Sequence, residues 1–344
     1  MAKNITLKWE LPGPEHMLGG LKLVAQKINE RTNGQVTIEV YGDGGVCFDP
    51  EIFQTVASGK LDIGYTGGGF GKSVGFAGIP RSEVGELPFW PSGEAGSAWV
   101  KALMDKYIMN DMLSLGVVPI LYEINGCDFT GNFTGPYYAQ VWCKRMYTSL
   151  ADAAGVRIWA EHDTSAAALK MIGLTPVVLS TPQVPAALKN GSIDGVLMSP
   201  ISCSRLFDLR EIVSCCLKVD YQQSEDNFTI MNKKTYDSLP TDIRDIVIEE
   251  IRALFKGVDR PATTKVGWQI WDEQVKAGKV KIIELSPEEK AKCKQQWGKP
   301  MEDDWVSRQI AAGFKNARAY MEDLKKMRDD ILAKGIPEYK GEIL

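Results

Sequence analysis

Ile5-Thr6-Leu7-Lys8-Trp9-Glu10-Leu11 alternates apolar and polar side chains and so predicts a β-strand with one buried face. Two further strands are predicted at residues 36–41 (VTIEVY) and 60–65 (KLDIGY). A helix is expected before each of them, the first ending at Gly34 and the second beginning near Asp49-Pro50. The order strand–helix–strand–helix–strand favours right-handed crossovers and a parallel sheet. The first 125 residues are therefore expected to form an α/β unit.

A second α/β unit is expected in residues 126–214. Strands are predicted there at residues 156–161, 177–179 and 192–197, with helices between them at residues 165–172 and 181–191. From about residue 240 the pattern becomes helical, and residues 287–334 are charged and amphipathic. These long helices are expected to brace the two α/β units.

Composition places the 344-residue chain among ordinary globular proteins. About 44% of the residues are apolar, 24% are charged and the formal net charge is −4, which excludes disordered, collagen-like and disulfide-dense classes. Basic residues form no tail or stripe, so nucleic acid is not expected as a partner. No apolar run approaches the roughly 18 residues of a membrane span, and the first residues carry no signal-peptide pattern. Composition leaves open both a cytoplasmic protein and an exported protein in its processed form.

Cysteine and histidine usage gives no sign of a metal site. The seven cysteines are odd in number and contain no C-x-x-C pair, so most are expected to be buried thiols, with room for one disulfide. No spacing of His, Cys or carboxylate matches a metal template, and no cofactor is expected. His162 fits a pocket-lining or surface histidine better than a catalytic one, because no motif pairs it with a nucleophile.

Residues 66–73 (TGGGFGKS) nearly satisfy the phosphate-binding pattern G-x-x-x-x-G-K-[ST]. Such a loop needs glycines that let backbone N–H groups point at the phosphates, and it leads into a helix. Here Thr66 replaces the first glycine, and the glycine-rich residues 73–78 predict no helix. We interpret the segment as a glycine loop at the carboxyl end of a strand, where open α/β sheets bind ligands. A nucleotide-dependent enzyme is the least favoured alternative.

Several segments together resemble the solute-binding proteins of tripartite ATP-independent periplasmic (TRAP) transporters, the DctP-like family. LADAAGVRI at residues 150–158 is similar to the family stretch L-x-D-L-x-G-x-K-I-R, and LKNGSIDG at residues 188–195 is similar to A-L-x-x-G-x-V-D-G. NKKTYDSLP at residues 232–240 resembles N-K-x-x-W-x-x-L-P, and LPF at residues 87–89 resembles the L-P-F element. The helix and strand expected over residues 49–62 also match. The matches follow the order of the family over residues 5–255.

The resemblance implies a two-lobed periplasmic-binding-protein fold with a hinged cleft. Lobe I would comprise residues 1–125 and about 215–255, lobe II residues 126–214 and about 256–300, and residues 301–344 would be C-terminal helices. Such a protein works in the periplasm, where it captures a small organic solute and delivers it to TRAP membrane permease subunits, without catalysis or cofactor. A ligand-sensing subunit of a signalling receptor is an alternative that the sequence does not separate from this function.

One family residue is missing from this chain. In the family, the arginine of K-I-R holds the carboxylate of the ligand, and Trp159 stands in its place here. A second family arginine falls near residues 140–142, where none is present. Arg157, on the same predicted strand face as Trp159, is an alternative partner for an organic acid. A flat indole favours an aromatic solute or a cation. We therefore expect an amine, a quaternary ammonium compound or a neutral aromatic molecule rather than a simple dicarboxylate or a sialic-type acid.

The other candidate ligand-binding residues lie near the predicted carboxyl ends of strands or match pocket positions of the family. The acidic candidates, which would complement a cation, are Glu10, Asp49, Glu161 and Asp163. The remaining candidates are Trp9, Tyr65, Thr66, Phe70, Trp142, His162, Met198, Ser199, Asp220 and Tyr221. No catalytic residue is assigned.

Overall fold

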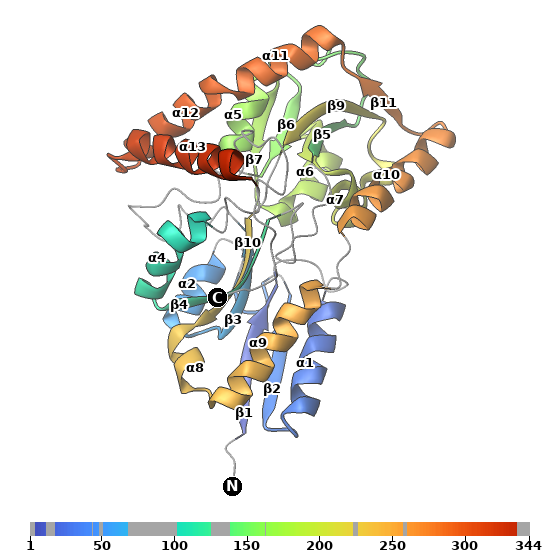
Figure 1. Cartoon of the computed structure of the whole chain (residues 1–344). Helices are drawn as coiled ribbons and strands as arrows, with labels where there is room; N and C mark the ends of the chain where they lie inside the picture. The colour runs from blue at the N-terminus through green and yellow to red at the C-terminus, as the bar shows by residue number, and fades with distance from the viewer. Residues whose placement is uncertain are drawn as a thin grey trace.

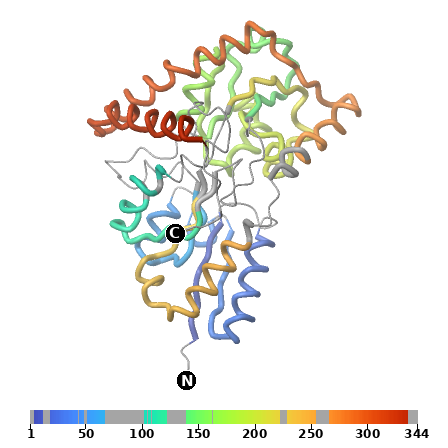
Figure 2. The backbone as a smooth tube through the Cα atoms, viewed as in Figure 1, coloured from blue at the N-terminus to red at the C-terminus, as the bar shows by residue number. Residues whose placement is uncertain are grey.

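The strands of the protein form two separate sheets, which lie in different halves of the molecule (Figure 1). The chain begins in one half, leaves it after residue 124, returns at residue 226 and leaves it again after residue 256 (Figure 2). The computed structural model describes residues 4–11, 18–42, 44–47, 51–67, 102–124, 138–161, 163–222, 226–256 and 260–335. Below, lobe I means the first sheet with its helices, and lobe II the second.

The first sheet contains the predicted parallel unit. Its order is β2 (Val36–Tyr41), β1 (Ile5–Glu10), β3 (Ile63–Gly67), β10 (Asp226–Asn232) and β4 (Val117–Ile124). β1 is parallel to both β2 and β3, as crossovers through α1 (Gly19–Arg31) and α2 (Ile52–Ser58) require. β10 is antiparallel to β3 and β4, so a segment far along the chain completes the sheet.

Three more helices belong to lobe I. They are α4 (Met109–Ser114), α8 (Lys233–Ser238) and α9 (Thr241–Lys256), and α9 lies beside α1 (Figure 1). The predicted apolar stripe of α9 is buried at Ile243, Val247 and Ile251, in one core cluster with the apolar face of α1. Arg31 at the end of α1 donates hydrogen bonds to both Glu249 and Glu250, which ties the two helices together.

The second sheet has six strands. Its order is β11 (Lys281–Glu284), β9 (Cys215–Gln222), β5 (Tyr138–Cys143), β8 (Gly195–Met198), β6 (Arg157–Ala160) and β7 (Thr175–Val178). β6 is parallel to β7 and β8, as predicted, whereas β5 is antiparallel to both of its neighbours. The helices of this part are α5 (Asp163–Met171), α6 (Val184–Asn190), α7 (Pro200–Arg205) and α10 (Arg260–Lys276), with short 3₁₀ turns at Thr181–Gln183 and Leu209–Glu211.

Residues 215–222 are placed differently from the prediction, which gave residues from about 215 onward to lobe I. They form β9, which hydrogen-bonds to β5 and β11 of the second sheet. The chain enters the first sheet only with β10 at Asp226. The boundary drawn from the family resemblance misplaced this strand, because strand partners are chosen by contacts between segments far apart in sequence.

Three C-terminal helices brace the molecule as predicted. They are α11 (Pro287–Trp297), α12 (Lys299–Ala311) and α13 (Ala317–Lys334). α11 and α12 pack on α5 of lobe II, and the Trp297 indole donates to the carbonyl of Ala168. α13 also reaches lobe I, because Asp323 pairs with Lys106 at 2.6 Å and accepts a hydrogen bond from Tyr107, both in the π-helical turn Met104–Ile108 before α4. Among the described helices, none has the length and apolar composition of a bilayer-crossing segment.

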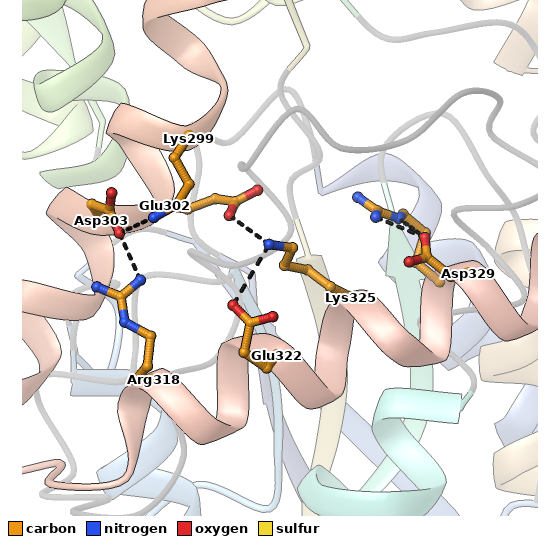
Figure 3. A network of polar contacts seen from close by, with 8 residues as sticks. Lys299, Glu302, Asp303, Arg318, Glu322, Lys325 and Asp329 are labelled. Carbon is orange, nitrogen blue, oxygen red and sulfur yellow. Dashed lines mark hydrogen bonds and ion pairs between the residues drawn. The ribbon is translucent and has the colours of Figure 1, made fainter.

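Ion pairs join α12 to α13 (Figure 3). Lys325 of α13 pairs with Glu302 of α12 at 3.2 Å, and Arg318 pairs with Asp303 at 2.6 Å. The Lys325–Glu302 pair is shielded, with only 25% and 12% of its side chains exposed, so solvent and salt screen it less than the exposed Arg318 pair. These ion pairs attach α13 to α12, which itself packs on α5.

Candidate functional site

In each sheet, the side on which the parallel strands end lies next to the corresponding side of the other sheet. In the first sheet, Ile124 at the end of β4 pairs with Asp226 at the start of β10. In the second sheet, Tyr138 at the start of β5 pairs with Gln222 at the end of β9. Only residues 223–225 separate Gln222 from Asp226, and an extended chain of that length spans at most about 14 Å. These two sides, called here the facing edges, form the candidate site because they belong to different lobes and meet where the chain crosses.

Glu10 ends β1 at the facing edge of lobe I. Its carboxylate is fully buried and accepts hydrogen bonds from the backbone N–H groups of Val46 at 3.2 Å and Cys47 at 3.1 Å. Charge-assisted bonds of this kind compensate for part of the desolvation of a buried carboxylate. Glu10 thus holds the segment after β2 against the end of β1, and burial with the nearby Glu10 raises the pKa of the Cys47 thiol to about 11.

The other lobe I candidates divide between core and edge. Trp9 is fully buried with Leu7 and Ile63 in the core between the sheet and α1 and α9. Tyr65 is partly buried and packs against the same core. Thr66, near the carboxyl end of β3, is fully buried, and its hydroxyl finds no hydrogen-bond partner within the described part of the chain.

A polar pair occupies the facing edge of lobe II. Gln140 of β5 donates to Asp220 Oδ1 at 3.0 Å, and the backbone N–H of Asp220 donates back to Gln140 Oε1 at 3.0 Å. The pair sits at an irregularity where residues 218–220 of β9 oppose Gln140 alone. Asp220 has a φ of 51°, a left-handed conformation that is uncommon for a non-glycine residue. Such a backbone persists where its surroundings enforce it, and the two Gln140 bonds do so here.

Three tryptophans support this edge from within lobe II. The indole N–H groups donate to backbone carbonyls at or just after the ends of β7 and β8: Trp142 to Met198, Trp159 to Leu179 and Trp271 to Pro200, at 2.8–2.9 Å. The Trp142 and Trp271 rings lie 4.2 Å apart, and both are fully buried. The ends of β7 and β8 are therefore positioned by side chains anchored in the core.

Trp159 is only 1% exposed, and its ring packs edge-on against Phe207 at a centroid distance of 5.5 Å. It belongs to a core cluster with Val184, Leu188 and Val196. As placed, the indole contacts the interior of lobe II rather than offering an open face. Contact between Trp159 and a solute stays a prediction.

Arg157 lies away from the facing edge. It begins β6, whereas the facing edge is at the other end of that strand, three residues or about 10 Å further on. Its guanidinium makes two parallel bonds of 2.9 Å to Asp194, and these bonds hold the pKa of the Asp194 carboxyl below its usual value. The alternative in which Arg157 receives an organic acid at the site therefore disagrees with the structure.

The remaining candidates are scattered. Met198 ends β8 and is buried, Ser199 caps α7 by accepting from the N–H of Ser202 at 3.2 Å, and Glu161 follows β6. Tyr221 points into the opposite core face, where its ring meets Trp297 at 5.1 Å. The candidates Asp49, Phe70 and His162, and most of residues 66–73, lie outside the described residues.

Two residues of this supporting core, Trp268 and Trp271, were missing from the sequence-based candidates. They are three residues apart on α10, and Trp268 lies 6.2 Å from Trp142. Residues at that spacing share one helix face. The pair was therefore a detectable signal that α10 packs against an aromatic core.

Comparison with known proteins gives the same overall picture. Residues 11–305 match the family model described as bacterial extracellular solute-binding protein, family 7. A TRAP solute-binding protein from a marine metagenome, specific for aromatic acid ligands, has a TM-score of 0.75 at 22% identity, covering 96% of this chain and 99% of that one. DctP7 of Bordetella pertussis, which binds pyroglutamic acid, has a TM-score of 0.74 at 20% identity over 94% of this chain and 99% of its own.

A third similar structure is DctPAm of Advenella mimigardefordensis, solved in complex with galactonate. Its TM-score is 0.72 at 16% identity, with 95% of this chain and 100% of that chain covered. At these identities the three structures share the fold with this chain.

Proposed function

The chain belongs to the bacterial extracellular solute-binding proteins of family 7, the DctP family, and on that basis we propose that it captures a small organic solute between its lobes and delivers it to a TRAP permease. Members of this family are receptors that work outside the cytoplasm. The fold supports capture, because each lobe presents one sheet edge to the other and the strands on both sides end there. Ligands of open α/β sheets bind outside such strand ends.

We expect the two lobes to close on the solute by hinge motion. Three residues join β9 to β10, and three join α9 to α10. Because Ile124 pairs with Asp226 and Tyr138 with Gln222, the β4–β5 and β9–β10 connections leave each lobe side by side. Hinge closure needs only a few residues at element ends that change their backbone angles. Closure of the lobes on a solute would let the permease distinguish loaded from empty protein.

We further propose that the solute presents a cationic amine or quaternary ammonium group, beside an aromatic or otherwise apolar body, to lobe II. The single observation that carries this proposal is the Gln140–Asp220 pair at the facing edge. Gln140 lies in the stretch where the family has an arginine, and here it pairs with the carboxylate of Asp220. Gln140 donates a hydrogen bond to Asp220 Oδ1, and a solute cation would bind to Oδ2. Arg157, the nearest described alternative for an acid, is paired with Asp194 at the far end of its strand.

An organic acid is the second candidate solute. It is favoured by the three similar structures, which bind an aromatic acid, pyroglutamic acid and galactonate. The two candidates require opposite charges at the site, so one screen separates them.

A matched pair of probes provides the test. Phenethylamine and phenylacetate share a phenyl ring and differ in the sign of the charged group, and pyroglutamate and galactonate represent the acids of the similar structures. A ligand at 100 times its dissociation constant adds about 2.7 kcal/mol of stability, which a thermal-shift assay detects as a rise in Tm. We expect the amine to raise the Tm and the acids to leave it unchanged.

Two aspartate variants make the assignment specific. Asp220→Asn removes the charge at the edge and should abolish the response to the amine. Asp208→Asn is the matched control, because Asp208 also has a left-handed φ, of 46°, but pairs with Arg210 away from the facing edge. A Tm rise produced by the acids alone, or an equal loss of response in both variants, would contradict the cationic solute and leave the receptor function standing.

A further inference from the structure

Two thiols face each other across neighbouring strands of lobe II. Cys143 is the last residue of β5, Cys215 is the first residue of β9, and the two are direct partners in the antiparallel pairing. Both side chains are fully buried, and both are free thiols in this structure. Directly opposed residues of an antiparallel pair point to the same side of the sheet.

The spacing of the pair suits a disulfide. Directly opposed residues have Cα atoms about 4.5 or 5.5 Å apart, depending on whether the pair exchanges backbone hydrogen bonds. Disulfides join residues whose Cα atoms are roughly 4.4–6.8 Å apart. Both values fall within this range, so a bond between the two sulfurs requires no separation or sliding of the strands.

The chemistry of the two sulfurs supports the same pairing. The Cys143 thiol donates a hydrogen bond to the Cys215 sulfur, which lowers the pKa of Cys215, with help from the backbone of Tyr147, and raises the pKa of Cys143. Cys216, the next residue, lies in the core cluster on the other side of the sheet with Cys203. Cys215 is therefore both the better thiolate and the one aligned with Cys143.

We propose that Cys143 and Cys215 form a structural disulfide that joins β5 to β9 when the chain folds in an oxidising compartment. The oxidant is a disulfide-bearing compound or enzyme. The Cys215 thiolate attacks one sulfur of the oxidant, giving a mixed disulfide and releasing one thiol. Cys143 then attacks the Cys215 sulfur of that mixed disulfide, which forms the Cys143–Cys215 bond and releases the second thiol. Two protein thiols are oxidised as one disulfide is reduced to two thiols.

Burial determines when the reaction occurs. Since neither sulfur is accessible in the folded protein, the bond forms while β5 and β9 are still pairing, and it then resists reduction. The far ends of the same two strands enter the connections between the lobes. The disulfide would thus join β5 and β9 covalently, and these are the two strands at which the β4–β5 and β9–β10 connections reach lobe II. This effect does not depend on which solute is bound.

Refolding under defined redox conditions tests the proposal. Protein unfolded with reductant is refolded with either reduced glutathione or a reduced and oxidised glutathione mixture, then unfolded and alkylated. We expect seven alkyl groups after reducing refolding and five after oxidising refolding, with one disulfide-linked peptide pair containing Cys143 and Cys215. Seven alkyl groups under both conditions would overturn the proposal, and so would a link confined to other cysteines, such as Cys203 with Cys216.

Variants separate this pair from the other buried thiols. Cys293→Ser removes a buried thiol outside the pair, so it should carry six alkyl groups after reducing refolding and four after oxidising refolding. Cys143→Ser should carry six under both conditions. Oxidising refolding should raise the urea midpoint of the natural sequence but not that of Cys143→Ser. If Cys143→Ser does not fold, Cys215→Ala replaces it, and the linked peptide of the natural sequence decides by itself. Two thiols lost on oxidation of Cys143→Ser would refute the pairing.

Discussion

Replacing Trp159 with phenylalanine separates two roles for this side chain, core support and solute contact. The substitution removes the N–H bond to the Leu179 carbonyl, at 2.9 Å, and shortens a ring that is only 1% exposed. Leu179 is partly exposed, so water replaces the lost donor in part, and the bond contributes about 0.5–1.5 kcal/mol. The smaller ring leaves a cavity that costs roughly 1–2 kcal/mol. We expect the free energy of unfolding to fall by about 1.5–3.5 kcal/mol.

Urea unfolding followed by circular dichroism measures this loss without relying on tryptophan fluorescence. Trp305→Phe is the matched control. Trp305 is fully buried on α12, and among the described residues its indole N–H has no acceptor, so its loss removes an unsatisfied donor and should cost about 1 kcal/mol less. The Tm increment caused by the solute should be unchanged in Trp159→Phe. Near-natural stability together with a lost solute response would refute core support and restore Trp159 as a solute contact.

Three further substitutions test the supporting structure. Gly195→Ala would place a Cβ 2.2 Å from the backbone carbonyl oxygen of Trp142 and should lower the free energy of unfolding by about 3 kcal/mol or more. The control Gly155→Ala, where the space is open and φ is +75°, should cost about 1 kcal/mol. Urea unfolding of both variants measures the difference. Asp194→Asn removes a carboxyl whose pKa is lowered by Arg157, so its small destabilisation should be present at pH 7 and shrink as the pH falls through that lowered pKa. A loss that does not change on acidification would contradict this. Asp323→Asn should weaken the α13 contact with lobe I, giving faster amide exchange in residues 317–334 for a stability change below about 1 kcal/mol.

Local pattern predicted most elements of the two parallel units. Residues 36–41 form β2 with the predicted bounds, and β6 and β7 lie within two residues of their predictions at 156–161 and 177–179. The stripe from Ile243 to Ile251 likewise marked the buried face of α9. These predictions succeeded because the period of burial along a strand or helix is a local property of the sequence.

The strands that complete the sheets were harder to find. β9 has eight residues, and Leu217 to Gln222 alternate apolar and polar side chains, so local pattern marks a strand here without identifying its partner. Its membership of the second sheet depends on β5, more than seventy residues earlier in the chain. Pattern within one segment carries no information about such a partner.

The sequence by itself determined the class of protein, through motifs in family order and alternating strands and helices. Only the tertiary structure decided which hydrogen-bond partner each important side chain has. Arg157 donates to Asp194, Trp159 donates to the Leu179 carbonyl, and Gln140 donates to Asp220. The reason is physical: a residue type limits which bonds a side chain can make, whereas the partner it finds depends on segments that only folding brings within hydrogen-bonding distance.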